Sequence, residues 1–132
     1  MAKEGGKKFD QEKLRPELYP VLAYEEICKV LTGGAIKYGD WNWAEGIKFS
    51  RLLGALKRHI AAFEKCDDVD PEFGALHLGH AGCCIAYLIH MYYCRPDMDD
   101  RRTPEEQGMK YAKEMMAETM NHLKELKDKK KK

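Results

Sequence analysis

The chain has 132 residues, of which 44% are hydrophobic and 34% are charged. That length fits one domain of ordinary size, and the hydrophobic share is too high for a wholly disordered protein. The 23 Lys and Arg residues nearly balance the 22 Asp and Glu residues, and the net charge of +1 argues against nonspecific nucleic-acid binding.

A first helix is predicted over residues 16–32, after an extended arm at residues 1–15. Apolar residues recur in this segment at three- and four-residue steps, as one face of a helix requires. The residues of this face are Leu18, Val21, Leu22, Cys28 and Leu31. The pair Gly33-Gly34 is expected to end the helix, because glycine is frequent just after helix C-termini.

A loop rich in aromatic residues follows from Tyr38 to Gly46, and both tryptophans of the chain lie in it. A second helix is expected to begin at Ser50, a good N-cap residue, and to run to about Phe63. In this helix His59 falls on the apolar face and is expected to point inward.

A third helix is predicted from Asp70-Pro71, which resembles an N-cap followed by a first-turn proline, to about Cys94. From Ala81 onward this helix is apolar almost all round, so it is expected to be the central buried element.

A fourth helix is expected to open at Thr103-Pro104. Its stripe of apolar or small residues is narrow, which leaves two alternatives open: a helix that covers the core, or a helix that pairs with a second subunit. The stripe consists of Met109, Ala112, Met116, Thr119, Leu123 and Leu126.

Together these segments predict an all-α fold, a compact bundle of about four helices in a chain that is expected to form a homo-oligomer. No run of residues shows the alternation of a strand. We divide the chain into a helical domain at residues 1–96, an amphipathic helix at 97–127 and a disordered Lys-rich tail at 128–132.

The longest nearly apolar stretch, residues 81–89, is less than half of the roughly 20 residues that span a bilayer, so no membrane partner is expected. The N-terminus lacks the apolar core of a signal peptide. The five cysteines contain no CxxC motif and are expected to be reduced thiols. These features predict a cytoplasmic protein.

Carboxylates and imidazoles gather in three of the predicted helices and suggest a metal site. Helical bundles bind hard divalent cations such as Mg²⁺ through inward-pointing carboxylates. Each residue also has a simpler interpretation, since Asp70 could only cap a helix and His59 could be a hydrogen-bonded core histidine. The spacing of His77, His80 and Cys84 also leaves a structural zinc module open.

Basic residues flank the aromatic loop and suggest phosphate binding, because guanidinium groups bind phosphate oxygens in a bidentate manner. A purine base can stack on indole or phenol rings, and the amide of Asn42 could bind its edge. The alternative interpretation is that Trp41 and Trp43 are core or interface anchors.

Several motifs together resemble the N-terminal domain family of phage dATP/dGTP diphosphohydrolases, distant members of the MazG-like, all-α nucleoside triphosphate pyrophosphohydrolases. The resemblance covers roughly residues 7–92. Its motifs are Lys8-Phe9-Asp10, Lys13-Leu14-Arg15, Leu18 to Pro20, Gly34 to Trp43, Gly46, Ser50-Arg51, Arg58-His59, Asp68-Val69-Asp70-Pro71-Glu72 and His77-Leu78-Gly79-His80-Ala81.

The resemblance implies hydrolysis of dGTP or dATP to the monophosphate and pyrophosphate, with Mg²⁺ or Mn²⁺ as cofactor. Mapped onto this chain, it assigns roles as follows. The catalytic residues would be Glu26, His59, Asp68 and His77, and the metal ligands Glu26, Asp68, Asp70, His77 and His80. Phosphates would be bound by Lys13, Arg15, Lys37, Arg51 and Arg58, and the base by Tyr38, Trp41, Asn42 and Trp43. The alternative is a relative that binds and sequesters its nucleotide without hydrolysing it.

Overall fold

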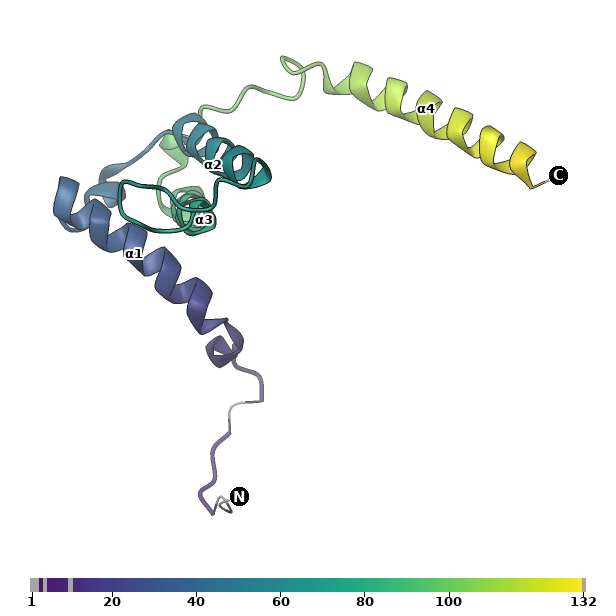
Figure 1. Cartoon of the computed structure of the whole chain (residues 1–132). Helices are drawn as coiled ribbons and strands as arrows, with labels where there is room; N and C mark the ends of the chain where they lie inside the picture. Colours follow the sequence, from purple (N-terminus) through teal and green to yellow (C-terminus); the bar gives the residue numbers. More distant parts are fainter. Residues whose placement is uncertain (1–2, 4, 10, 132) are drawn as a thin grey trace.

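Four α-helices and three short 3₁₀ helices make up the computed structural model, which describes residues 3, 5–9 and 11–131 (Figure 1). Within these residues there is no strand, only an isolated bridge between Val69 and Leu76. The prediction of an all-α fold is therefore confirmed. Asp10, part of the first motif of the resemblance, lies outside the described residues, as does Lys132 at the end of the Lys-rich tail.

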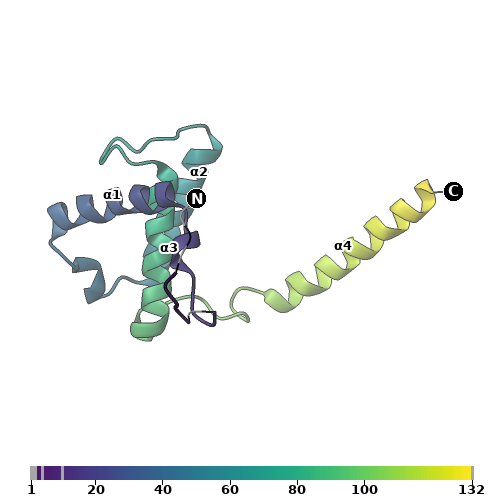
Figure 2. The same cartoon turned by 90° about the horizontal axis from the view of Figure 1, so that it is seen from below.

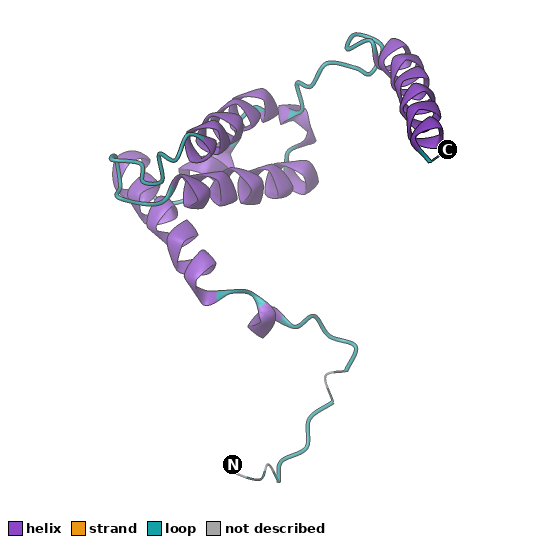
Figure 3. Cartoon of the chain, turned by 45° about the vertical axis from the view of Figure 1, so that its right-hand side comes forward, coloured by secondary structure: helices purple, strands orange, loops and turns teal. Residues whose placement is uncertain are grey.

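Three helices form the packed part of the molecule: α1 (Val21–Tyr38), α2 (Phe49–Glu64) and α3 (His77–Cys94). Helix α2 runs beside α3, and α1 crosses α3 on another side (Figures 2 and 3). Both core clusters include α3. One contains Val30, Ala75 and Cys83, and the other contains Phe49, Leu52 and Met91. The expectation that the third helix is the central buried element is confirmed.

The predicted end of the first helix is wrong, because α1 continues through Gly33 and Gly34 to Tyr38. Gly33 is needed for a close contact. A Cβ atom at this position would lie 2.6 Å from the ring of Phe73. The glycine therefore lets the loop after α2 pack on the helix, and its low helix propensity is outweighed by this tertiary contact. At the other end, residues Pro16–Leu18 form a separate 3₁₀ helix.

The predicted caps of the next two helices are also wrong. Helix α2 begins at Phe49, and Ser50 instead donates from its hydroxyl and its backbone N–H to the carboxylate of Asp100. Helix α3 begins at His77, seven residues after Asp70. Asp70 caps a local turn, accepting from the backbone N–H of Glu72 at 2.8 Å. This turn directs the Asp70 side chain toward the first turn of α3.

Helix α4 (Met109–Lys130) extends away from the other helices, and none of its residues is buried (Figure 1). Thr103 and Glu106 form a capping box, with bonds of 2.9 and 3.2 Å, at the position where the fourth helix is expected to open. The helix nevertheless starts later, because Gly108 has φ of +69°. In this structure α4 does not cover the core; its pairing with a second subunit stays a prediction.

The helix continues into the Lys-rich tail, for which the sequence predicts no structure. Lysines in the last turn interact favourably with the helix dipole, which explains helical structure to Lys130. None of the helices in the described part of the chain combines the length and the apolar character that crossing a bilayer requires.

Candidate metal and nucleotide site

Two imidazoles and one carboxylate converge where α2 and α3 meet the loop between them. His59 lies on α2, His77 lies in the first turn of α3, and Asp70 lies in the loop. Each offers one ligand atom, and these three atoms lie within 4.8 Å of one another. The two Nδ1 atoms of His59 and His77 are 2.9 Å apart. Two nitrogen ligands at adjacent positions on one metal ion, each about 2.1 Å from it, would be about 3 Å apart.

A third imidazole, His80, lies directly beside this group. Its ring is stacked between His59, at a centroid distance of 4.5 Å, and Phe73, at 5.8 Å. Its Nε2 atom is 3.9 Å from Oδ2 of Asp70, and Nδ1 of His77 is the same distance from that oxygen. Asp70 thus faces both His77 and His80.

The outer nitrogen of His77 faces a second carboxylate. Its Nε2 atom is buried and lies 3.5 Å from Oδ2 of Asp67. Nε2 of His77 and Nε2 of His80 are buried, and neither forms a hydrogen bond with another residue that the structure describes. Histidine ligands of metals commonly donate their other N–H to a carboxylate, and Asp67 is placed for this role toward His77.

Burial, more than any other cause, lowers the pKa of His59 below its ordinary value of 6.5. The neighbouring rings of His80 and His77 lower this pKa further, whereas the charge of Asp70 opposes the effect. His59 is therefore neutral at pH 7, and a neutral imidazole is the form that binds metals.

Acidification should destabilise the metal-free protein through His59. Its pKa of 6.5 in the unfolded chain is higher than in the folded chain, so between the two values the unfolded state binds more protons. The free energy of unfolding should thus be fully retained above pH 6.5 and fall as the pH drops below it. Thermal unfolding in chelator between pH 5 and 8 measures this loss. A variant His59→Gln should show a smaller loss, and His122→Gln on exposed α4 should behave like the parent chain.

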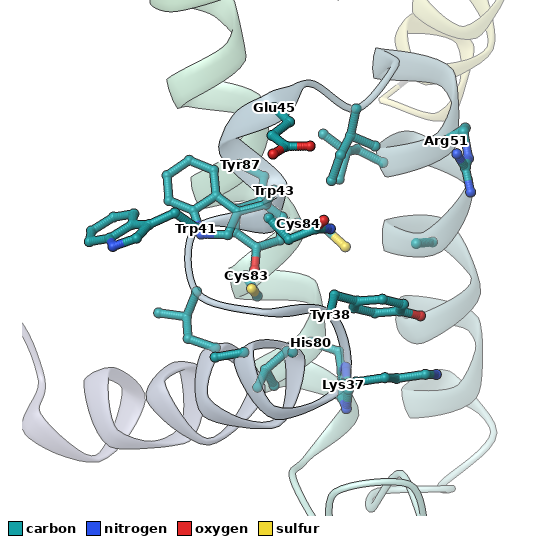
Figure 4. Close-up of a pocket in the computed structure, with 18 of the residues that line it drawn as sticks. Lys37, Tyr38, Trp41, Trp43, Glu45, Arg51, His80, Cys83, Cys84 and Tyr87 are labelled. Carbon is teal, nitrogen blue, oxygen red and sulfur yellow. The ribbon is translucent and has the colours of Figure 1, made fainter.

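A cavity of about 980 Å³ adjoins this group of histidines. It lies between the C-terminal end of α1, the 3₁₀ helix Asn42–Glu45, α2 and α3 (Figure 4). His59 and His80 line it, so the metal-ligating group and the cavity share a wall. A volume of this size lies in the range of ligand-binding pockets.

Three of the five predicted phosphate-binding residues line the cavity: Lys37, Arg51 and Arg58. Lys37 forms an ion pair of 2.7 Å with Glu72. Within the described residues, no carboxylate lies in ion-pair distance of either arginine, so both guanidinium groups are available to a ligand. The other two, Lys13 and Arg15, lie on the exposed N-terminal arm and do not line the cavity.

All four residues predicted to bind the base line the cavity, and the two tryptophans differ in packing. The side chain of Trp41 is 72% exposed. Trp43 is half-buried, with its ring stacked on Tyr87 at 5.1 Å and packed against the second core cluster. Tyr38 and Asn42 are exposed at the rim. Trp43 therefore has a structural role whatever it binds, whereas Trp41 is free to contact a ligand.

The structure places two of the predicted acidic ligands away from the histidines. The carboxylate of Glu26 accepts from the backbone N–H of Leu76 at 2.6 Å and pairs with Lys29 at 3.0 Å. These two contacts, the backbone bond first, lower the pKa of Glu26. The side chain of Asp68 is exposed, and only its backbone carbonyl approaches the site, accepting from His77 N at 2.9 Å.

Sequence reasoning missed Phe73 and Tyr87, which line the cavity and pack on His80 and Trp43 respectively. Tyr87 lies seven residues after His80, on the same face of the helix, so helical spacing could have identified it. Cys84 also lines the cavity and is buried, which raises its pKa to about 11. It is not part of the group of metal-ligating atoms, which does not favour the zinc module with Cys84 as ligand.

Comparison with known proteins identifies the family of the chain. A family model described as "dATP/dGTP diphosphohydrolase, N-terminal" matches residues 3–101, which include every residue of the site. A curated protein of Salmonella phage PMBT28, named dATP/dGTP diphosphohydrolase, is 42% identical to the chain over 97 residues. The matched part is 74% of this chain and 33% of the relative, so the chain spans about a third of the relative's length. No solved structure matches the chain.

Proposed function

Because the chain belongs to the family of dATP/dGTP diphosphohydrolase N-terminal domains, as its motifs predict, we propose that it hydrolyses a purine deoxynucleoside triphosphate to the monophosphate and pyrophosphate. The substrate is dGTP or dATP, and a divalent cation takes part. One observation supports the proposal most strongly. The group formed by His59, Asp70 and His77 adjoins the cavity, which is also lined by arginines and tryptophans.

The residues present fit a divalent metal. The ligand atoms of His59, His77 and Asp70 are close enough to reach one ion, and His77 has a carboxylate, Asp67, behind its outer nitrogen. Two imidazoles and one carboxylate suit Mn²⁺ better than Mg²⁺, which prefers oxygen ligands. Of the two expected cofactors we therefore favour Mn²⁺. A bound ion would neutralise phosphate charge and make water nucleophilic at neutral pH.

The cavity orients the nucleotide by the chemistry of its two ends. In Figure 4 Lys37 and His80 lie at one end, and Trp41 and Trp43 lie toward the other. The triphosphate belongs at the first end, where Arg58, the residue before His59 on α2, binds its non-bridging oxygens. Arg51 lies nearer the second end in Figure 4. The base belongs beside Trp41 at the second end, where stacking contributes about 1–3 kcal/mol.

The imidazoles at the phosphate end of the cavity are the groups that can accept the proton of the attacking water. We assign uptake of the proton from the attacking water to His80, because it lines the cavity and its Nε2 has no hydrogen-bond partner in the described structure. Asp70, 3.9 Å from this nitrogen, stabilises the imidazolium that results. The ring stack with His59 and Phe73 keeps His80 in one orientation during attack on the α-phosphorus.

The test is incubation of the protein with each of the four deoxynucleoside triphosphates, in Mg²⁺, in Mn²⁺ and in chelator. Release of pyrophosphate and monophosphate from a purine nucleotide, dependent on metal, supports the proposal. Tight stoichiometric binding with the nucleotide recovered intact supports the sequestering alternative. No binding of any nucleotide refutes both.

Replacing Trp41 by Ala should weaken purine nucleotide binding with little change in thermal stability. The ring is 72% exposed, so little packing is lost, whereas loss of base stacking costs about 1–3 kcal/mol, roughly 5- to 150-fold in Kd. Trp43→Ala is the matched comparison and should lower Tm, because its ring packs on Tyr87. Binding titrations and thermal unfolding of both variants measure the contrast, and a large fall in Tm for Trp41→Ala would make Trp41 a core residue.

A further inference from the structure

A carboxylate without a partner lies at the base end of the cavity. Figure 4 shows Glu45 beside Trp43, at the opposite end of the cavity from Lys37 and His80. Within the described chain its side chain forms no hydrogen bond and no ion pair; only its backbone carbonyl is bonded. By contrast, the carboxylate of Glu72, which also lines the cavity, is held by Lys37.

The backbone of Glu45 is fixed even though its side chain is free. Its carbonyl accepts from Nη1 of Arg95 at 2.6 Å, and Arg95 in turn donates two hydrogen bonds, of 3.0 and 2.8 Å, to the carboxylate of Asp97. The next residue, Gly46, has φ of +116°, and a Cβ there would lie 2.9 Å from the same Arg95 nitrogen. These contacts fix the backbone that carries the carboxylate. Less conformational entropy is therefore lost when the carboxylate binds a ligand.

We infer that Glu45 makes the site selective for guanine over adenine. This inference rests on the proposed function, since it concerns the base of the proposed nucleotide. The Watson–Crick edge of guanine presents two adjacent donors, N1–H and the N2 amino group, and an ionised carboxylate offers two acceptor oxygens to them. Adenine presents its N1 as an acceptor at the same place, which a carboxylate repels. Asn42, three residues earlier in the same 3₁₀ helix, offers amide donors for O6 of guanine.

Asp40 is the other carboxylate of the cavity wall without an ion-pair partner among the described residues. It precedes Trp41 and lies outside the 3₁₀ helix, so it lacks the anchorage that Arg95 gives to Glu45. We therefore assign base selection to Glu45 and use Asp40 as the matched control.

The experiment measures binding of α,β-methylene analogues of dGTP, dATP and dITP, which are not cleaved to pyrophosphate, by the parent chain, Glu45→Gln and Asp40→Asn. The parent chain should bind the guanine analogue about 10- to 100-fold more tightly than the adenine analogue. The hypoxanthine analogue, which lacks the N2 amino group, should bind with intermediate affinity. Glu45→Gln should abolish or invert the preference, because its amide can donate to N1 of adenine, and Asp40→Asn should keep it.

The outcomes separate this inference from the proposed function. An unchanged guanine preference in Glu45→Gln, or its loss in Asp40→Asn, overturns the assignment to Glu45 while leaving nucleotide binding intact. Equal affinity of the parent chain for the guanine and adenine analogues overturns it without any variant. Failure of the parent chain to bind any purine analogue refutes the proposed function itself. Thermal unfolding of each variant confirms that the fold is kept.

Discussion

Replacing Asp70 by Asn is expected to lower metal-dependent pyrophosphate release more than about 100-fold, with only a small change in stability. Oδ2 of Asp70 lies 3.9 Å from Nδ1 of His77 and 3.9 Å from Nε2 of His80. The substitution removes the negative charge that these two imidazoles face. The other oxygen accepts the backbone N–H of Glu72 at 2.8 Å, and an asparagine oxygen can keep that bond. The substitution therefore removes the metal-ligating charge while preserving the turn.

Asp68→Asn is the matched control for this variant. Asp68 lies in the same loop, but its side chain is exposed, and its contact with His77 uses the backbone carbonyl. It should retain turnover close to that of the parent chain. A second readout is the rise of Tm with Mn²⁺, since a ligand at 100 times its Kd stabilises the folded state by about 2.7 kcal/mol. The rise should persist in Asp68→Asn and shrink in Asp70→Asn; full Mn²⁺ binding by the latter would remove Asp70 from the site.

The sequence predicts the helices because their apolar periodicity is local, but it does not predict where they end. Gly33-Gly34 has the chemistry of a stop signal, and only the ring of Phe73, about 40 residues later, explains why the helix continues. Asp70-Pro71 has the chemistry of a helix cap, yet the same side chain satisfies a turn seven residues before α3. In the first case a tertiary contact, and in the second a local turn, decides between two structures that the residues permit.

For the candidate site, the sequence predicts the kinds of residue but not their partners. Imidazoles on two helices and an acidic loop suggest metal binding, and the structure brings His59, Asp70 and His77 together. Glu26 has the same chemistry as a ligand, but it bonds to the N–H of Leu76, the residue that precedes α3. The way in which α1 crosses α3 decides whether Glu26 faces the metal-ligating group or the start of α3. The apolar periodicity of the two helices does not predict this crossing.

This crossing explains why one buried glycine should control both stability and the metal site. A Cβ at Gly79 would lie 2.9 Å from Cγ of Glu26 and 3.0 Å from its backbone oxygen. Helices α1 and α3 would have to separate there, so Glu26 would lose its bond to Leu76 N at the start of α3. Since His77 and His80 lie in that first turn, the displacement reaches the metal-ligating group.

Gly79→Ala should accordingly destabilise the protein and weaken Mn²⁺ binding. Forcing a methyl group into a packed contact costs about 1–3 kcal/mol, more than the roughly 1 kcal/mol that alanine gains over glycine in a helix. Gly34→Ala on α1 has the same propensity gain, but no atom lies within 4 Å of its Cβ, so it should stabilise the protein. Urea unfolding of the two variants isolates the steric cost, because the propensity gain is common to both. Equal stabilisation by both substitutions would show that α1 and α3 do not pack as closely as the Glu26 contact requires.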